Sequence, residues 1–238
     1  AVVGLAKEPP ATGSFADSVA RVTHTEPRAL PLVPDPPPAV DGQLEDWAHV
    51  PGVMLLNRAE QATWGGDGWK SAADLSAKVW VAWRPDMLYL AAEVTDDQLR
   101  QTEAGGDVHK GDHIQFLLDV APDKEPTRGH FGAGQFQLAL SPGNFGRGGA
   151  PQADLRPEIR CLRPAALALK GAVIAAQPTG RGYRLEAGIP WSLLGVKRPA
   201  VGVPVKFEVA VFDADGTEGR PEKLLSFSTM QWSTDRAR

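Results

Sequence analysis

The chain has 238 residues, of which 42% are hydrophobic and 23% charged, and its net charge is −4 at pH 7. These values are typical of a globular domain and give no reason to expect nucleic-acid binding, which depends on clustered basic side chains. The sequence also lacks the run of about 20 apolar residues that a membrane-spanning helix requires. Cys161 is the only cysteine, which excludes an intrachain disulfide and a cysteine-rich zinc site.

Residues 1–38 carry little periodic apolar pattern and are rich in proline, most densely at Pro34–Pro38. Proline fixes φ and lacks an N–H, so this run cannot form a central strand. We therefore predict that residues 1–38 are an extended N-terminal segment or linker, and that one domain spans residues 39–238. The alternative is a cover segment packed on the domain, for which Val19–Val22 would supply the apolar contacts.

The domain begins with a turn at Asp41-Gly42, followed by Trp47, which a short helical turn directs into the core. Patterns of apolar residues then predict strands that are separated by loops rich in Gly, Pro and Asp. These strands span residues 53–56, 78–84, 87–94, 113–119, 135–141, 158–162, 170–177, 182–189, 205–212 and 224–227. About ten strands with few helices indicate an all-β protein, an antiparallel β-sandwich.

Polar side chains alternate with apolar ones in two of the predicted strands. One strand carries His113 and Gln115 on its polar side, and the next carries Gln135 and Gln137. Residues i and i+2 lie on the same side of a strand. If the two strands pair, these side chains form one polar face whose amides both donate and accept hydrogen bonds, which suits a sugar. A plain solvated sheet face has the same pattern.

Two tryptophans, Trp64 and Trp69, flank a glycine-rich loop. Aromatic rings on such loops suggest ligand contact. The alternative is that both rings fold back and close the end of the sandwich.

Five motifs in chain order resemble those of family 9 carbohydrate-binding modules. They lie in the stretches Val40–Trp47, Asp74–Trp83, Leu88–Asp97, Gly111–Asp119 and Tyr183–Trp191. No single motif is specific, but their order is. The resemblance, which covers about residues 39–232, implies a jelly-roll-like β-sandwich related to the DOMON group. It also implies a non-catalytic domain that binds carbohydrate and is often appended to a larger secreted enzyme.

The resemblance also implies a ligand site. In sugar-binding members, a stacking tryptophan stands where this chain has His109, a glutamate where it has Gln115, and an arginine where it has Gln137. A second stacking tryptophan matches Trp232, and Trp64 and Trp69 are further candidates for ring contacts. One aromatic ring is therefore replaced and two charged groups are neutral here, which points to a different ligand or to lost binding.

Carboxylates at Asp213, Asp215 and Glu218 have calcium-like spacing, although the full twelve-residue loop pattern is missing. Two interpretations fit these residues: a structural calcium ion, which some family members contain, and an acidic turn after a strand. Asp96, Asp97 and Asp119 are equally ambiguous.

Hydrolase, metalloprotease and phosphate-loop motifs do not occur in the sequence. Glu186 has the chemistry of a general acid, but it also fits a strand position and has no apparent partner carboxylate. We expect an extracellular or periplasmic module that catalyses nothing and has carbohydrate as its partner. The alternatives are an interaction domain without a small ligand, and a haem-binding relative with ligands among Met54, Met87, His109 and His113.

Overall fold

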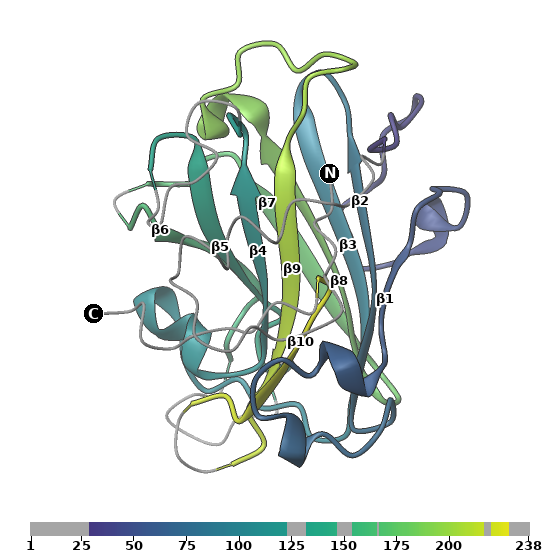
Figure 1. Ribbon diagram of the computed structural model, residues 1–238, viewed down its shortest axis with the longest axis vertical. Coiled ribbons are helices and arrows are strands. Elements are labelled where there is room, and N and C mark those ends of the chain that lie inside the picture. Colours follow the sequence, from purple (N-terminus) through teal and green to yellow (C-terminus); the bar gives the residue numbers. More distant parts are fainter. Residues whose placement is uncertain (1–28, 123–131, 147–153, 166, 217–219, 229–238) are drawn as a thin grey trace, which may run out of the picture.

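The structure, a computed structural model, describes residues 29–122, 132–146, 154–165, 167–216 and 220–228. Within these ranges the chain forms ten strands in two five-stranded antiparallel sheets, which pack face to face (Figure 1). Sheet A has the order β1-β2-β3-β8-β7, and sheet B has the order β10-β9-β4-β5-β6. The predicted antiparallel β-sandwich is confirmed.

The strands of sheet A are β1 (Met54–Leu56), β2 (Leu75–Trp83), β3 (Met87–Asp96), β7 (Val173–Thr179) and β8 (Gly182–Pro190). The strands of sheet B are β4 (His113–Asp119), β5 (Gln135–Ser141), β6 (Glu158–Arg163), β9 (Lys206–Asp213) and β10 (Lys223–Ser226). The described helices are the short 3-10 turns η1 (Glu45–Trp47), η2 (Ala59–Gln61), η3 (Gly66–Gly68), η4 (Gly105–Lys110) and η5 (Trp191–Leu194). None of these turns has the length and apolar character of a membrane span.

Period-two alternation fills the space between the sheets with apolar side chains. In β4, for example, Ile114, Phe116 and Leu118 are all at least 97% buried in the central core cluster. Burying each side chain of this kind stabilises the fold by about 1.5–3 kcal/mol. Strand β3 is apolar on both faces because its outer residues Tyr89 and Ala91 belong to a second buried cluster.

Residues just before the predicted domain start lie against β2. Trp83 N donates to Pro31 O at 2.9 Å, and Val33 N donates back to Trp83 O at 3.0 Å. The Trp83 indole N–H also donates to Leu30 O at 3.1 Å. This stretch therefore packs on the sandwich although it is proline-rich. Residues 1–28 lie outside the described residues, so the boundary at residue 38 stays a prediction.

Candidate ligand-binding face and acidic cluster

The outer face of sheet B carries the polar side chains that the sequence predicted. Strand β4 pairs with β5 and β9, with Gln115 opposite Ala139 on one side and Ala210 on the other. In the neighbouring row Gln137 lies opposite Leu117. Directly paired residues project from the same side of a sheet, so Gln115 stands between two small alanines with Gln137 close by.

His113, Gln115 and Gln137 are joined by side-chain hydrogen bonds. The Nε2 atoms of His113 and Gln115 are 3.0 Å apart, and Gln137 Nε2 donates to Gln115 Oε1 at 2.8 Å. Gln115 is only 5% exposed, whereas Gln137 is half-buried. Strands β4 and β5 pair, so the condition for one shared polar face is met. Gln135 lies apart from this chain of bonds and donates to Asp119 at 2.8 Å.

The His113 ring is fully buried and stacks on Phe212, with ring centroids 4.4 Å apart and planes 14° from parallel. Burial lowers the pKa of His113 to about 4, so the ring is neutral at physiological pH. Its Nδ1 atom lies 2.7 Å from Gly111 O, and its Nε2 atom faces Gln115. Both nitrogens are thus engaged, which leaves neither for a haem iron. Of the other haem-ligand candidates, Met54 is 97% buried in the core.

The structure separates the two tryptophans of the glycine-rich loop. Trp64 packs against the outer-face residues Phe212 and Leu224, and its carbonyl accepts a 3.0 Å hydrogen bond from Leu224 N. Gly65 permits this close approach, because its φ is +65° and a Cβ there would lie 1.9 Å from Glu222 O. Trp64 therefore lies on the same face as Gln115, at the β10 edge.

Trp69 instead folds back onto the sandwich. Its indole N–H donates to Leu75 O at 2.8 Å, and its ring packs against the core cluster between the sheets. Of the remaining candidates, His109 lies exposed in η4, with Nδ1 3.0 Å from Gly106 O. Trp232 lies outside the described residues.

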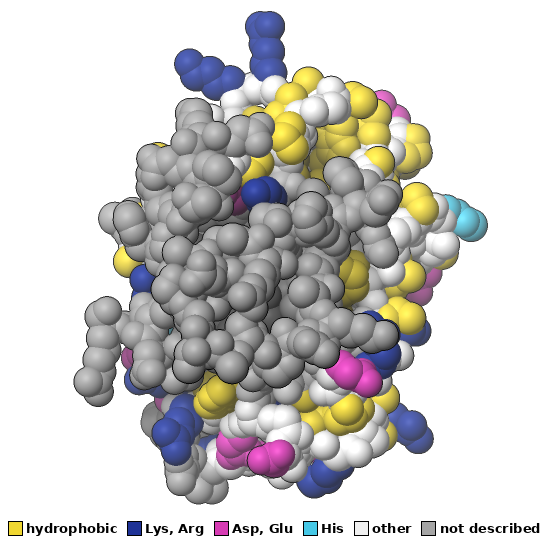
Figure 2. Space-filling view, viewed as in Figure 1, with side chains coloured by type: hydrophobic (Ala, Val, Ile, Leu, Met, Phe, Trp, Pro, Cys, Tyr) yellow, Lys and Arg dark blue, Asp and Glu magenta, His cyan; other side chains and the backbone are white. Residues whose placement is uncertain are grey.

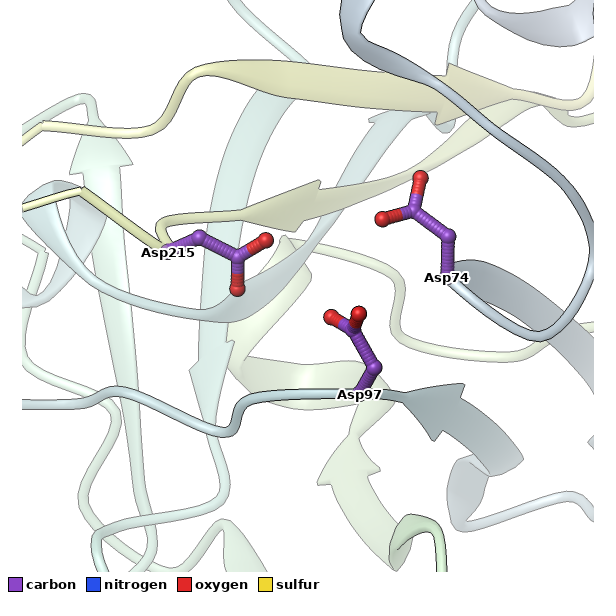
Figure 3. Close-up of side chains that lie close together, drawn as sticks. All are labelled: Asp74, Asp97 and Asp215. Carbon is purple, nitrogen blue, oxygen red and sulfur yellow. The ribbon is translucent and has the colours of Figure 1, made fainter.

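Six aspartates gather where β3, β9 and the loops before β2 and β4 come together at one end of the sandwich. Asp74, Asp97 and Asp215 direct their carboxylates toward a shared space (Figure 3). Asp96, Asp213 and Asp215 form a second group, and in both groups the candidate ligand atoms lie within 4.8 Å of one another. Asp112 lies beside them, and its carboxylate accepts from the backbone of Arg100 and Ala214. Glu218, the third residue of the predicted calcium site, lies outside the described residues.

Lys223 supplies a positive charge to both groups. Its Nζ atom lies 3.1 Å from Asp74 Oδ1, 3.1 Å from Asp213 Oδ2 and 3.2 Å from Asp215 Oδ2, and the side chain is 96% buried. Burial acts against the charged form, but these carboxylates outweigh it and raise the pKa of Lys223. The lysine thus balances part of the negative charge from within the fold.

The second group retains oxygen atoms without hydrogen-bond donors. These are Asp96 Oδ2, Asp215 Oδ1 and both carboxylate oxygens of Asp213, one of which has only the ion pair with Lys223. Burial, together with the neighbouring negative charges, raises the pKa of Asp96 to about 6 and that of Asp213 to about 7. Carboxylate oxygens of this kind are the ligands of hard cations. The donor set therefore fits a metal ion.

The two five-stranded antiparallel sheets define an all-β sandwich domain. A family model described as carbohydrate family 9 binding domain-like matches residues 40–234, and the chain belongs to this family. Domains of the family are non-catalytic binding modules.

Two solved structures share the fold. Both are of a family 9 carbohydrate-binding module from Caldicellulosiruptor kristjanssonii, one in complex with cellotriose and the other with glucose. Each is 19% identical to this chain and covers 83% of it, with TM-scores of 0.58 and 0.57, and the matches span 82% and 83% of those chains. A search of curated proteins gave no match.

Proposed function

We propose that this domain binds a saccharide on the outer face of sheet B and leaves it chemically unchanged. The observation that carries the proposal is the pair of linked amides, Gln115 and Gln137, on the same face as the ring of Trp64. Amides supply donors and acceptors for hydroxyl groups, and an aromatic ring supplies an apolar surface for sugar C–H groups. The cellotriose and glucose complexes of the two similar structures support a glucose-containing ligand.

The arrangement of strands favours an oligosaccharide. Trp64 packs at β10, and Gln137 projects from β5, which is three strands away in sheet B. At the usual spacing between neighbouring strands, this separation is roughly 14 Å. A ligand that contacts both side chains must lie across the strands, which favours an oligosaccharide over a single sugar ring.

Titration calorimetry with a glycan panel that includes cello-oligosaccharides tests this proposal. We expect saturable binding that weakens about tenfold or more in Trp64→Ala and in Gln137→Ala. Trp232→Ala tests the tryptophan that the family resemblance implies. Val201→Ala is the control, because Val201 is 85% exposed in the loop before β9, whereas β10 pairs with the other end of β9 (Figure 1). Figure 2 shows hydrophobic side chains gathered at the top of the view, the end at which Figure 1 draws the loop between η5 and β9. Binding that neither site variant weakens would contradict the proposed face.

We also propose that Asp96, Asp213 and Asp215, with Glu218 as a further ligand, hold a structural calcium ion. Their buried oxygens without donors support this proposal. Calcium would supply the positive charge that Lys223 alone does not, and would tie the end of β3 to the end of β9. We expect calcium to raise the Tm of EDTA-treated protein, and Asp213→Asn to abolish that rise. Asp107→Asn is the control, because Asp107 pairs with Lys110 in η4 outside the cluster. An equal Tm with calcium and with EDTA would contradict the site.

Family membership further supports the proposal that the domain is an accessory of a larger secreted enzyme, in the extracellular space or the periplasm. Fractionation of source cells, with antibody detection of the domain and measurement of the apparent chain mass, tests this proposal. Recovery in the cytoplasmic fraction would contradict it.

A further inference from the structure

The backbone carbonyl of Gly111 determines which groups donate and which accept in the hydrogen bonds at the centre of the outer face. His113 Nδ1 lies 2.7 Å from Gly111 O. A carbonyl oxygen can only accept, so the ring must carry its proton on Nδ1. In a neutral imidazole the other nitrogen, Nε2, is then an acceptor. Complete burial lowers the pKa of His113 to about 4, which keeps the ring neutral.

The tautomer of His113 fixes the orientation of the two glutamine amides. Because His113 Nε2 accepts, the group that Gln115 places 3.0 Å from it must be its N–H. The carbonyl Oε1 of Gln115 then points to Gln137, whose Nε2 donates to it at 2.8 Å. The carbonyl Oε1 of Gln137 is therefore not used in this network, and no other described residue donates a hydrogen bond to it.

Of the three hydrogen-bonded side chains, Gln137 alone is within reach of a ligand. His113 is fully buried and Gln115 is 95% buried, whereas Gln137 is half-buried. The stacking of His113 on Phe212 at 4.4 Å fixes the ring plane and with it the direction of Nε2. A buried group that touches no ligand thus determines which atom of Gln137 is presented at the surface.

We propose that His113 is a specificity-determining positioning residue, which makes Gln137 present its carbonyl oxygen and so selects a neutral saccharide that donates a hydroxyl hydrogen there. This inference rests on the proposed saccharide site on sheet B and names the polarity that this site recognises. A ligand in which that hydroxyl is replaced by fluorine has the same shape but no hydrogen to donate, and it loses the hydrogen bond.

A double-mutant cycle between ligand and protein tests the proposal. The tightest saccharide from the panel and its monodeoxyfluoro series are titrated into the wild type and His113→Phe, which keeps a ring against Phe212 but has no acceptor. In the wild type, one fluoro position should weaken binding roughly tenfold. In His113→Phe, where the Gln115 amide is free to flip, that loss should shrink to about twofold or less.

Long-range ¹H–¹⁵N spectra of wild-type His113 provide a second readout that needs neither a ligand nor a folded variant. The proposal requires the neutral tautomer with the proton on Nδ1. A proton on Nε2 would overturn it, as would a fluoro penalty of equal size in both proteins. If the wild type bound no saccharide at all, the proposed function would fail together with the specificity role. If binding persisted with an unchanged penalty in His113→Phe, the specificity role alone would fail.

Discussion

The indole N–H of Trp47 donates a 2.7 Å hydrogen bond to Oε1 of Glu186, 139 residues further along the chain. The other carboxylate oxygen of Glu186 accepts from the backbone N–H groups of Asp41 and Gly42, at 3.1 Å and 2.7 Å. Glu186 thereby ties the first turn of the domain to β8. With three donors on its carboxylate, it is a structural residue and not a general acid.

Glu186→Ala should lower the free energy of unfolding by about 2–4 kcal/mol, because it leaves three N–H groups without their acceptor. Glu93→Ala on the adjacent strand is the matched control. Glu93 faces Lys78 and Arg184 at a half-exposed surface position, where such pairs contribute about 1 kcal/mol or less. Urea denaturation measures both values, and equal losses in the two variants would contradict the role of Glu186.

Of the two loop tryptophans, Trp69 should contribute mainly to stability and Trp64 mainly to saccharide binding. Trp69→Ala removes a core contact and a hydrogen bond to Leu75, and should cost about 2–4 kcal/mol of stability. Trp64→Ala should cost less stability but weaken saccharide binding. Thermal unfolding and calorimetry on the same samples check the pair. The assignment fails if Trp69→Ala is as stable as the wild type and loses affinity.

Lys223→Met should be strongly destabilising in EDTA, by about 3–5 kcal/mol, because it leaves buried carboxylates without their cation. Added calcium should recover part of this loss by neutralising Asp213 and Asp215. Lys70→Met is the control, because Lys70 contacts the same Asp74 at 3.8 Å from a side chain that is 74% exposed. Denaturation with and without calcium measures the effect, and similar losses in both lysine variants would argue against the account.

Stability should depend on pH through His113. Its pKa in the folded protein is about 4, below the usual 6.5, because of burial and to a smaller degree the nearby His109. Between these values the unfolded chain binds the proton and the folded chain does not, so stability falls as pH drops from 6.5 toward 4. The loss amounts to on the order of 3 kcal/mol.

His113→Phe should lack this part of the pH dependence. The comparison has to be a difference between wild type and variant, because the raised pKa values of Asp96 and Asp213 act in the opposite direction in both proteins. Denaturation at a series of pH values supplies the difference. An identical slope in the two proteins would show that His113 does not titrate as its burial requires.

Local pattern was sufficient to predict most of the sandwich. Alternation around Phe116 and Leu138 identified the inner faces of β4 and β5, because the side of a strand is set by period two alone. The same logic placed Gln115 and Gln137 on one face, and the pairing of β4 with β5 then brought them into contact. The proline-rich residues before the domain looked like a linker, yet Pro31 and Val33 pair with β2, which local pattern does not reveal.

Contacts between segments far apart in the chain could not be predicted from the sequence. The sequence pointed to Asp213 and Asp215 through their spacing and left Asp96 ambiguous, but Asp74 and Lys223 join them only because the two sheets end side by side. Trp64 and Trp69 had the same local signal. What separates them is Gly65, whose positive φ brings Trp64 against β10, a conformation that a glycine-rich loop permits without specifying.

The most direct test is an NMR titration of the side-chain amides with the tightest-binding saccharide. The account predicts saturable shifts of the Gln137 and Gln115 amide signals on the outer face of sheet B. It predicts no shift for Gln177 in β7 of sheet A, whose Nε2 donates to Asp41 O at 2.9 Å. Shifts confined to Gln177 and other residues of sheet A, with Gln137 unmoved, would contradict it.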